Sequence, residues 1–231
     1  MLIGLDAIPL TEPLAGVGHY TLELAQALAR AAPSDEFELV YPSSYPPVDL
    51  SEVQPSLPAN LKPARVRVGA LGRRWFVAGL PHYVRARGLA LFHGTNYEVP
   101  LWGGGAKVVT VHDLSLLLHP ETHEARRVRR ARRRLPLMLS AADAVITPTE
   151  CVRREVCEHL GVPASKVFAV PEAARGCFRP SAFDETEETR RRLGVGNEFL
   201  LAVGTVEPRK NLPALVRAFE EVLRARPPCD L

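Results

Sequence analysis

Cysteine and long hydrophobic runs are scarce in this sequence. The four cysteines, Cys151, Cys157, Cys177 and Cys229, form no C-x-x-C pair and have no histidine at zinc-site spacing, so no structural zinc site is indicated. This cysteine usage is typical of a reducing compartment. No apolar run reaches the ~18 residues of a membrane-spanning helix, and residues 1–6 are too short for the apolar core of a signal peptide. These absences predict a cytoplasmic protein.

The sequence also lacks the motifs of two classes of protein, the dinucleotide-dependent dehydrogenases and the nucleic-acid-binding proteins. No G-x-G-x-x-G motif opens the first expected helix, and no acidic residue ends a second strand at a suitable place. Both absences disfavour a dinucleotide-dependent dehydrogenase. The basic residues are not interleaved with aromatic ones, and no nucleic-acid-binding motif is present. A non-catalytic Rossmann-like module that binds anions or nucleic acid stays as the alternative to an enzyme.

What the sequence does contain is a regular alternation of apolar runs and helical patterns. Its 231 residues are 46% apolar and 24% charged, as in an ordinary globular protein. Short continuous apolar runs predict strands that are buried on both faces, which favours an α/β fold with a parallel sheet. We expect strands at 2–7, 37–41, 65–68, 89–93, 107–112, 144–147, 166–170 and 198–203; helices after 18, over 73–87, after 126, over 149–160 and 189–193, and from 212; an exposed loop at 42–63; and an interdomain connection at 171–188.

Several chemically useful residues follow strands of this predicted sheet. They are Asp6, the glycine-bearing loop Gly16–Gly18, the pair His93–Gly94 and the pair His112–Asp113. In open parallel sheets, ligands bind at the carboxyl ends of the strands. We therefore expect Gly16, His93 and His112 to lie at the same edge of the sheet.

Arginine is concentrated in one segment. Residues 126–134 hold seven arginines in nine positions, and nothing before Pro136 breaks a helix. Like charges on about two and a half helical turns repel one another. An external anion would relieve this repulsion, whether nucleic acid, an anionic bilayer or a phosphorylated substrate. The alternative is a solvated helix face that pairs with Glu121 and Glu124. The residues are Arg126, Arg127, Arg129, Arg130, Arg132, Arg133 and Arg134.

Near its end the sequence combines three features of a phosphate site. The apolar run 199–203 stops at Gly204, and a turn with the adjacent cations Arg209 and Lys210 precedes a helical pattern that begins at Leu212. A helix N-terminus offers unpaired N–H groups and the positive end of the helix dipole, and the two side chains add full charges. The segment therefore predicts a phosphate-binding turn between a strand and a helix.

Taken together, these segments resemble the retaining GT-B glycosyltransferases of family 4, in particular the bacterial mannosyltransferase-like members. The order and spacing of the motifs agree over nearly the whole chain. The motifs that carry the resemblance are Gly16–Tyr20, Phe92–Asn96, Thr110–Leu114, Ala142–Thr147, Gly161–Val167, Phe178–Pro180 and Val203–Asn211.

The resemblance implies a GT-B fold with two Rossmann-like domains. Residues 1–178 would form the acceptor-side domain, with helices on both faces of its sheet. Residues 179–231 would form a linker and the incomplete beginning of the nucleotide-sugar-binding domain. The family's later pair of glutamates, which contact the sugar and the ribose, would lie beyond Leu231. We therefore expect the chain to be a fragment that does not turn over by itself.

The same resemblance implies the site residues. His112 matches a histidine near the transferred sugar and is the expected catalytic residue. Gly16 and Gly18 would let the backbone approach the donor phosphates, where a Cβ atom would obstruct it. Arg209 and Lys210 would bind the donor diphosphate. Contacts to the acceptor or the sugar are implied for His93, Asn96 and Asp113, and contacts to a membrane or an anionic acceptor for the arginines of 126–134.

The implied reaction transfers a sugar from a nucleotide-sugar donor to a saccharide or lipid-linked acceptor with retention of configuration. GDP-mannose is the favoured donor, and peripheral association with the inner face of the membrane is implied. Because Arg209 and Lys210 would stabilise the leaving diphosphate, no metal cofactor is expected. Many relatives carry an arginine directly after the glycine, where this chain has Thr205, so donor binding should depend more on the two remaining cations. Glu207 is expected to be a turn residue.

Overall fold

The computed structural model of the protein describes residues 1–50, 57–69, 74–196 and 198–225. The chain divides into two units, Met1–Ala173 and Ala174–Leu231. None of the described helices is both long and apolar enough to cross a lipid bilayer.

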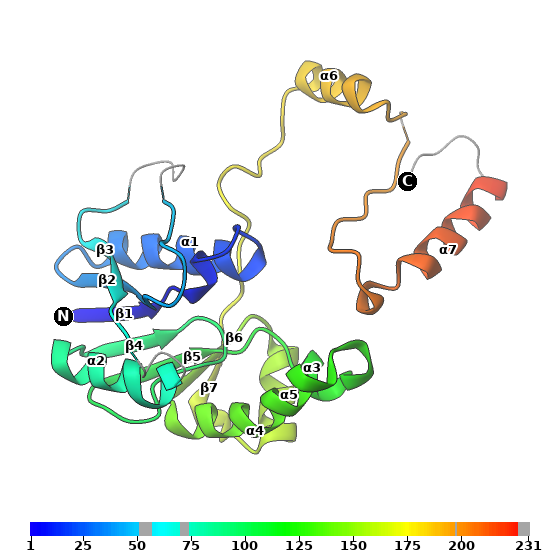
Figure 1. The fold of residues 1–231 in the computed structure, drawn as a ribbon. Helices are drawn as coiled ribbons and strands as arrows, with labels where there is room; N and C mark the ends of the chain where they lie inside the picture. The colour runs from blue at the N-terminus through cyan, green and yellow to red at the C-terminus, as the bar shows by residue number, and fades with distance from the viewer. Residues whose placement is uncertain (51–56, 70–73, 197, 226–231) are drawn as a thin grey trace. The chain divides into compact units, whose positions relative to one another are not determined.

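The first unit is built on a seven-stranded sheet in which every adjacent pair is parallel (Figure 1). The strand order is β3-β2-β1-β4-β5-β6-β7, so the direction of winding reverses between β1 and β4. Ligands of open α/β sheets bind at such a switch point. The predicted Rossmann-like α/β fold is confirmed. The strands are β1 Leu2–Asp6, β2 Glu36–Pro42, β3 Leu61–Val66, β4 Leu91–Gly94, β5 Ala106–Thr110, β6 Ala144–Thr147 and β7 Val167–Ala169.

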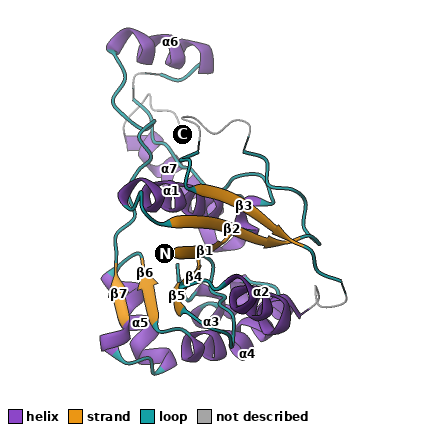
Figure 2. Cartoon of the chain, turned by 90° about the vertical axis from the view of Figure 1, so that its left-hand side faces the viewer, coloured by secondary structure: helices purple, strands orange, loops and turns teal. Residues whose placement is uncertain are grey.

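Both faces of the sheet are buried, which explains the continuous apolar runs. Successive residues of a strand point to opposite faces. In β2, Leu39 and Val40 are both fully buried, but Leu39 belongs to one core and Val40 to the other. Figure 2 shows α1 on one side of the sheet and α2 and α4 on the other. The helices of this unit are α1 Gly16–Ala31, α2 Leu80–Arg87, α3 Ser115–Leu118, α4 Ala125–Ala141 and α5 Glu150–Leu160, with short turns at Ile8–Leu10, Trp75–Gly79, Pro120–Thr122 and Ala164–Lys166.

Local signals explain how α5 begins and ends. The Thr149 hydroxyl accepts a hydrogen bond from the Val152 N–H group at 3.1 Å and caps the N-terminus of the helix. Gly161 ends the helix in the left-handed conformation, with φ of 65°. The helix expected over 149–160 is therefore confirmed within one residue.

The glycine-bearing loop predicted at Gly16–Gly18 is wrong. Both glycines lie in the first turn of α1. A Cβ atom at Gly18 would lie 3.0 Å from the Pro9 carbonyl oxygen, whereas one at Gly16 would meet nothing within 4 Å. Gly18 is thus explained by the close approach of the helix to the segment that follows β1. Gly16 leaves open space at the N-terminus of the helix.

The exposed loop predicted over residues 42–63 is also partly wrong. Strand β3 already begins at Leu61 and includes Pro63, although proline is a strand breaker. Because β3 is an edge strand, a missing N–H group there need not cost a ladder hydrogen bond. Residues 51–56 of this loop, and Arg73 at the start of the predicted helix 73–87, lie outside the described residues.

The second unit contains two helices but lacks the predicted strand. Helix α6 spans Phe183–Leu193, so it begins inside the expected connection 171–188, and α7 spans Leu212–Ala225. Residues 198–203 form no strand in the described part of the unit, and their apolar side chains are exposed, for example 77% for Leu201 and 86% for Val203. A parallel strand needs a neighbour for its backbone hydrogen bonds, and apart from a single β-bridge at Phe199 the described part of this unit holds no second strand.

Candidate active site

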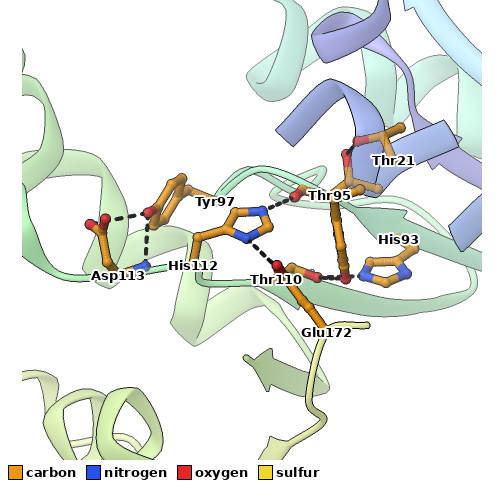
Figure 3. A network of polar contacts seen from close by, with 9 residues as sticks. Thr21, His93, Thr95, Tyr97, Thr110, His112, Asp113 and Glu172 are labelled. Carbon is orange, nitrogen blue, oxygen red and sulfur yellow. Dashed lines mark hydrogen bonds and ion pairs between the residues drawn. The ribbon is translucent and has the colours of Figure 1, made fainter. Parts of the chain in front are cut away.

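The candidate site lies where β1, β4 and β5 end side by side. In the sheet register, Leu5 of β1 is opposite His93 of β4, and Gly94 is opposite Val109 of β5. The residues that follow these positions meet at one edge of the sheet (Figure 3). The structure therefore places Asp6, His93 and His112 together at the switch point, and α1 reaches the same place through Tyr20.

His112 is held by contacts on several sides of its ring. Its Nε2 atom lies 2.9 Å from the carbonyl oxygen of Thr95, and because a carbonyl only accepts, Nε2 must carry a proton. The edge-to-face contact with Tyr20 has a centroid distance of 4.9 Å, and Nδ1 lies 3.3 Å from a carboxylate oxygen of Glu172. The side chain keeps 15% exposure. It is thus oriented, and part of it faces solvent.

A buried chain of hydroxyl groups joins α1 to the sheet beneath this site. The Thr21 hydroxyl donates to the Thr95 hydroxyl at 2.9 Å, and Thr95 donates to the carbonyl oxygen of Asp6 at 2.9 Å. Thr21 and Thr95 have no exposed surface. Because the carbonyl of Thr95 also accepts from His112, this chain fixes the loop that orients the histidine.

His93, for which the resemblance implies a sugar contact, is buried, and its side chain is hydrogen-bonded to Thr110. Only 4% of the residue is exposed, and its Nε2 atom lies 2.8 Å from the Thr110 hydroxyl, which in turn lies 2.9 Å from the hydroxyl of Tyr20. Burial, with a smaller contribution from His112, lowers the pKa of His93 to about 4. His93 is therefore neutral near pH 7, and its contacts support Tyr20.

Asp113 is engaged in its own loop. One carboxylate oxygen accepts from the backbone N–H group of Ser115 at 2.9 Å and from its hydroxyl at 2.8 Å, at the start of α3. The Asp113 N–H group donates to the hydroxyl of Tyr97 at 3.0 Å. Tyr97 has a φ of 64°, a conformation that costs a bulky residue about 1–3 kcal/mol. Burial and the Asp113 carboxylate raise the pKa of Tyr97. These contacts hold the loop after β5 in place.

The turn after β4 requires a glycine. A Cβ atom at Gly94 would lie 1.9 Å from the carbonyl oxygen of Glu98, so the chain folds back too tightly for any side chain. Asn96 lies in this turn, is half-buried and has no hydrogen-bond partner among the described residues. Of the three residues with implied sugar contacts, Asn96 is the one whose side chain has no competing partner in the described part of the chain.

Asp6 is a buried carboxyl group at the same edge. It is 2% exposed, and one oxygen accepts from the Ile8 N–H group at 3.2 Å. Burial, with a smaller contribution from the nearby Glu98, raises the pKa of Asp6 to about 7, although the Ile8 hydrogen bond acts in the opposite direction. Such a shift is common at functional sites.

Comparison with known proteins identifies the family. A family model for the Glycosyltransferase Family 4 domain matches residues 14–173. The chain belongs to glycosyltransferase family 4. The match covers strands β2 to β7, the glycines of α1 and every residue of the site around His112 except Asp6.

Two curated relatives are similar to this family 4 chain. One, the O-antigen chain mannosyltransferase B of Escherichia coli, is 27% identical over 228 residues, which cover 92% of this chain and 58% of the relative. Another, the D-inositol 3-phosphate glycosyltransferase of Kineococcus radiotolerans, is 33% identical over 91 residues, or 39% of this chain and 21% of the relative. The chain thus spans little more than half the length of the first of these.

Solved structures support the fold. Anabaena Alr3699/HepE in complex with UDP-glucose matches with a TM-score of 0.64 at 15% identity, over 99% of this chain and 58% of that one. A glycosyltransferase from Rickettsia africae matches with a TM-score of 0.57 at 10% identity, over 99% of this chain and 59% of that one. The fold is shared with these neighbours, and the Rossmann-like sheet of the family 4 chain is of the GT-B type.

The arginines of α4 divide into two groups. Arg134 pairs with Glu98 at 2.8 Å and lies 5.7 Å from the ring centre of Phe76, and Arg130 pairs with the same carboxylate at 3.4 Å. Neither pairs with Glu121 or Glu124, the partners considered from the sequence. The remaining arginines are exposed and have no ion-pair partner in the described part of the chain: Arg126, Arg127, Arg129, Arg132 and Arg133.

In the second unit, the predicted turn and the helix after it are both present. Arg209 and Lys210 lie in the single turn Pro208–Lys210, and Asn211, with φ of 48°, joins this turn to the N-terminus of α7. Arg209 pairs with Glu207 at 2.7 Å. The Lys210 side chain lies close to Gly204, since a Cβ atom there would be 3.8 Å from Cε of the lysine. The sequence predicted that Arg209 and Lys210 lie in a turn before a helix, but it did not predict the ion pair between Arg209 and Glu207.

The sequence did not single out Tyr20, Thr21, Thr95, Thr110, Tyr97 or Glu172 as site residues, although several lie in the motifs that carry the resemblance. Thr95 lies just beyond the predicted strand 89–93, and Thr110 lies within the predicted strand 107–112, near its end; those positions were the available signal. Among the described residues, no group of three His, Cys, Asp or Glu side chains is arranged to hold a metal ion.

Proposed function

We propose that the protein containing this chain is a retaining glycosyltransferase that transfers a sugar, with mannose favoured, from a nucleotide-sugar donor to a saccharide or lipid-linked acceptor. The observation that carries the proposal is the oriented, partly exposed ring of His112 at the switch point of a family 4 sheet. The name of the Escherichia coli relative supports mannose and that of the Anabaena neighbour supports a nucleotide-sugar donor.

In this proposal the first unit binds the acceptor and the second begins the donor-binding domain. His112 contacts the transferred sugar, and Asn96 provides a further contact. At α1, the residue before the helix is Ala15, which offers no side-chain cap, and Gly16 faces open space. The N–H groups of the first turn are therefore available to a donor phosphate.

The cations of the second unit stabilise the leaving group. When the bond between sugar and phosphate breaks, negative charge grows on the nucleotide diphosphate. A fixed cation lowers the energy of that transition state more than that of the ground state, which is what raises the rate. Arg209 and Lys210 supply this charge ahead of the N-terminus of α7, so we expect no requirement for a metal cofactor.

The full-length enzyme tests this function. We expect transfer from GDP-mannose to a mannoside acceptor in the presence of EDTA, with nuclear magnetic resonance showing the same anomeric configuration in product and donor. UDP-glucose is the matched comparison, since the structural neighbour was solved with it. An inverted product, or strict dependence on magnesium, would contradict the proposal. Absence of transfer together with binding of nucleic acid would favour the non-catalytic module instead.

The exposed arginines of α4 support peripheral binding to an anionic membrane. Each basic residue near an anionic bilayer contributes about 1 kcal/mol, and salt screens this attraction, with a screening length of ~3 Å at 1 M. We therefore expect the protein to pellet with phosphatidylglycerol vesicles at low salt, to be released at high salt, and to ignore phosphatidylcholine vesicles. Replacement of Arg126, Arg129, Arg132 and Arg133 with glutamate should abolish pelleting.

This variant keeps Arg130 and Arg134, whose ion pairs with Glu98 belong to the folded structure. Circular dichroism should therefore show an unchanged fold. If the wild-type protein does not sediment with anionic vesicles even at low salt, these arginines form only a solvated helix face.

A further inference from the structure

A cavity of about 530 Å³ lies beside the site described above, and no role has been assigned to it. It opens where the chain leaves β1 and β2, at Ile8 and at Ser44–Tyr45. Its far wall consists of the turn Trp75–Gly79 and two arginines of α4. The residues that line it are Ile8, Ser44, Tyr45, Gly69, Arg74, Trp75, Phe76, Val77, Arg130 and Arg134.

The cavity adjoins the reaction centre through the residues that follow β1. Ile8 lines the cavity, and its N–H group donates to the side chain of Asp6. The carbonyl of Asp6 accepts from Thr95, whose own carbonyl accepts from His112. Hydrogen bonds therefore connect the wall of the cavity to His112 through residues 6–8 and then through Thr95.

Positive charge is concentrated in the lining of the cavity. Three guanidinium groups line it, those of Arg74, Arg130 and Arg134. Glu98 is shared by the two arginines of α4, and Arg74 has no ion-pair partner among the described residues. Among the described residues, Glu98 is therefore the one carboxylate that forms ion pairs with these guanidinium groups, and it pairs with two of the three. Arg134 is also held against the ring of Phe76, so its donors are oriented before any ligand binds.

Apolar side chains also line the cavity, mainly from the turn Trp75–Gly79. This turn is a π-helix, a rare conformation that is frequent at functional sites. It contributes Phe76 and the 44% exposed Val77, and the 38% exposed Tyr45 lines the cavity as well. The indole N–H group of Trp75 is buried and has no acceptor in the described part of the structure. An orphaned buried donor is uncommon and requires an explanation.

We propose that this cavity binds the phosphate group of a phosphorylated acceptor, with the arginines on the phosphate and the apolar wall against the group that it esterifies. The inference rests on the proposed function for the identity of the ligand as acceptor, but the binding itself is independent of catalysis. Guanidinium groups in a fixed arrangement recognise phosphate by charge-assisted, paired hydrogen bonds. The phosphate belongs either to a soluble sugar phosphate or to a lipid-linked sugar diphosphate.

The direct test is binding of three probes to the full-length protein by calorimetry: methyl α-mannoside, mannose 1-phosphate, and mannose linked through a diphosphate to a long-chain alcohol. We expect the phosphorylated probes to bind more tightly than methyl α-mannoside. The double variant Arg74→Gln/Arg130→Gln should raise their Kd roughly tenfold or more and leave that of methyl α-mannoside unchanged. Arg134 is kept, because it also packs on Phe76.

The matched control is Arg85→Gln/Arg154→Gln. It removes two positive charges from exposed positions of α2 and α5 that do not line the cavity. We expect no change in the Kd of any probe. Equal loss of binding in the two double variants, or equal affinity of the wild-type protein for all three probes, would overturn the proposal. Tighter binding of the lipid-linked probe than of mannose 1-phosphate assigns the phosphate to a lipid, and equal binding assigns it to a soluble sugar.

Kinetics separate this proposal from the proposed function. In the transfer reaction, Arg74→Gln/Arg130→Gln should raise KM for a phosphorylated acceptor and leave kcat and the donor KM unchanged. Phosphate-dependent binding without any transfer would contradict the proposed function and support the cavity. Transfer that is insensitive to the acceptor phosphate and to this variant would support the proposed function and contradict the cavity.

Discussion

Replacement of Asp6 with asparagine is expected to stabilise the protein above pH 7 and to have much less effect near pH 4. The buried carboxyl has its pKa raised from 3.8 to about 7. The folded protein therefore retains this proton up to about pH 7, whereas the unfolded chain releases it near pH 4. Stability contributed by this group is lost as the pH rises through that window. At 1.36 kcal/mol for each pKa unit, the full effect at pH 8 is about 4 kcal/mol.

Urea denaturation of the wild type and Asp6→Asn between pH 4 and pH 8 measures this difference. The asparagine side-chain oxygen can still accept from the Ile8 N–H group, so the substitution removes the charge and keeps this hydrogen bond. Glu124→Gln, at an exposed position before α4, is the matched control and should not change the pH dependence. A stability difference that is the same at both ends of the range would show that burial of the charge is not the cause.

A carboxylate that destabilises the fold in this way is expected where it contributes to activity. Asp6 links Ile8 of the cavity to Thr95 of the His112 loop by hydrogen bonds. If Asp6→Asn raises stability and lowers activity together, the carboxylate serves the site rather than the fold.

The sheet was predictable from the sequence because its strands are buried on both faces. Residues such as Leu39 and Val40 face different cores, which forces a continuous apolar run that no other local structure explains as well. Strand ends were also predictable, and with them the meeting of Asp6, His93 and His112. Pro63 misled the prediction, since its tolerance depends on the edge position of β3, which only the strand order reveals.

The roles of the individual side chains were less predictable. His93 and His112 both end apolar runs, but His93 lies inside β4 and is buried, whereas His112 lies two residues beyond the end of β5 and is partly exposed. Because side chains alternate between the two faces of a sheet, a shift of one residue in the position of a strand end moves a side chain to the other face. The hydrogen bonds from Thr21 to Thr95 and from Thr95 to Asp6 join residues far apart in sequence, so no local pattern predicts them.

The strand expected at 198–203 shows the same limit. Its composition is that of a buried strand, yet Leu201 and Val203 are exposed in the described unit. The local sequence pattern determines which secondary structure a segment favours. The segment forms a strand only when a neighbouring strand offers free backbone N–H and C=O groups. The turn that follows does not need such a neighbour, because its own contacts, among them Arg209 with Glu207, stabilise it locally.

In the full-length enzyme, Lys210→Ala is expected to reduce kcat by roughly a hundredfold or more, the typical cost of one preorganised transition-state contact. Lys210 should matter more than its neighbour for a structural reason. Arg209 shares its charge with Glu207 at 2.7 Å, whereas Lys210 has no carboxylate partner among the described residues and lies over Gly204. Its charge is therefore the one left available for the leaving diphosphate.

Steady-state kinetics with GDP-mannose measure this effect, and Arg217→Ala is the matched control. Arg217 is a cation of the same unit, exposed on α7 beyond its first turn, where the helix dipole no longer favours an anion. We expect its kcat to equal that of the wild type. Because the lysine acts on charge that develops as the bond breaks, kcat should fall more than the donor KM rises. Unchanged kcat in Lys210→Ala would exclude this lysine from stabilising the leaving group.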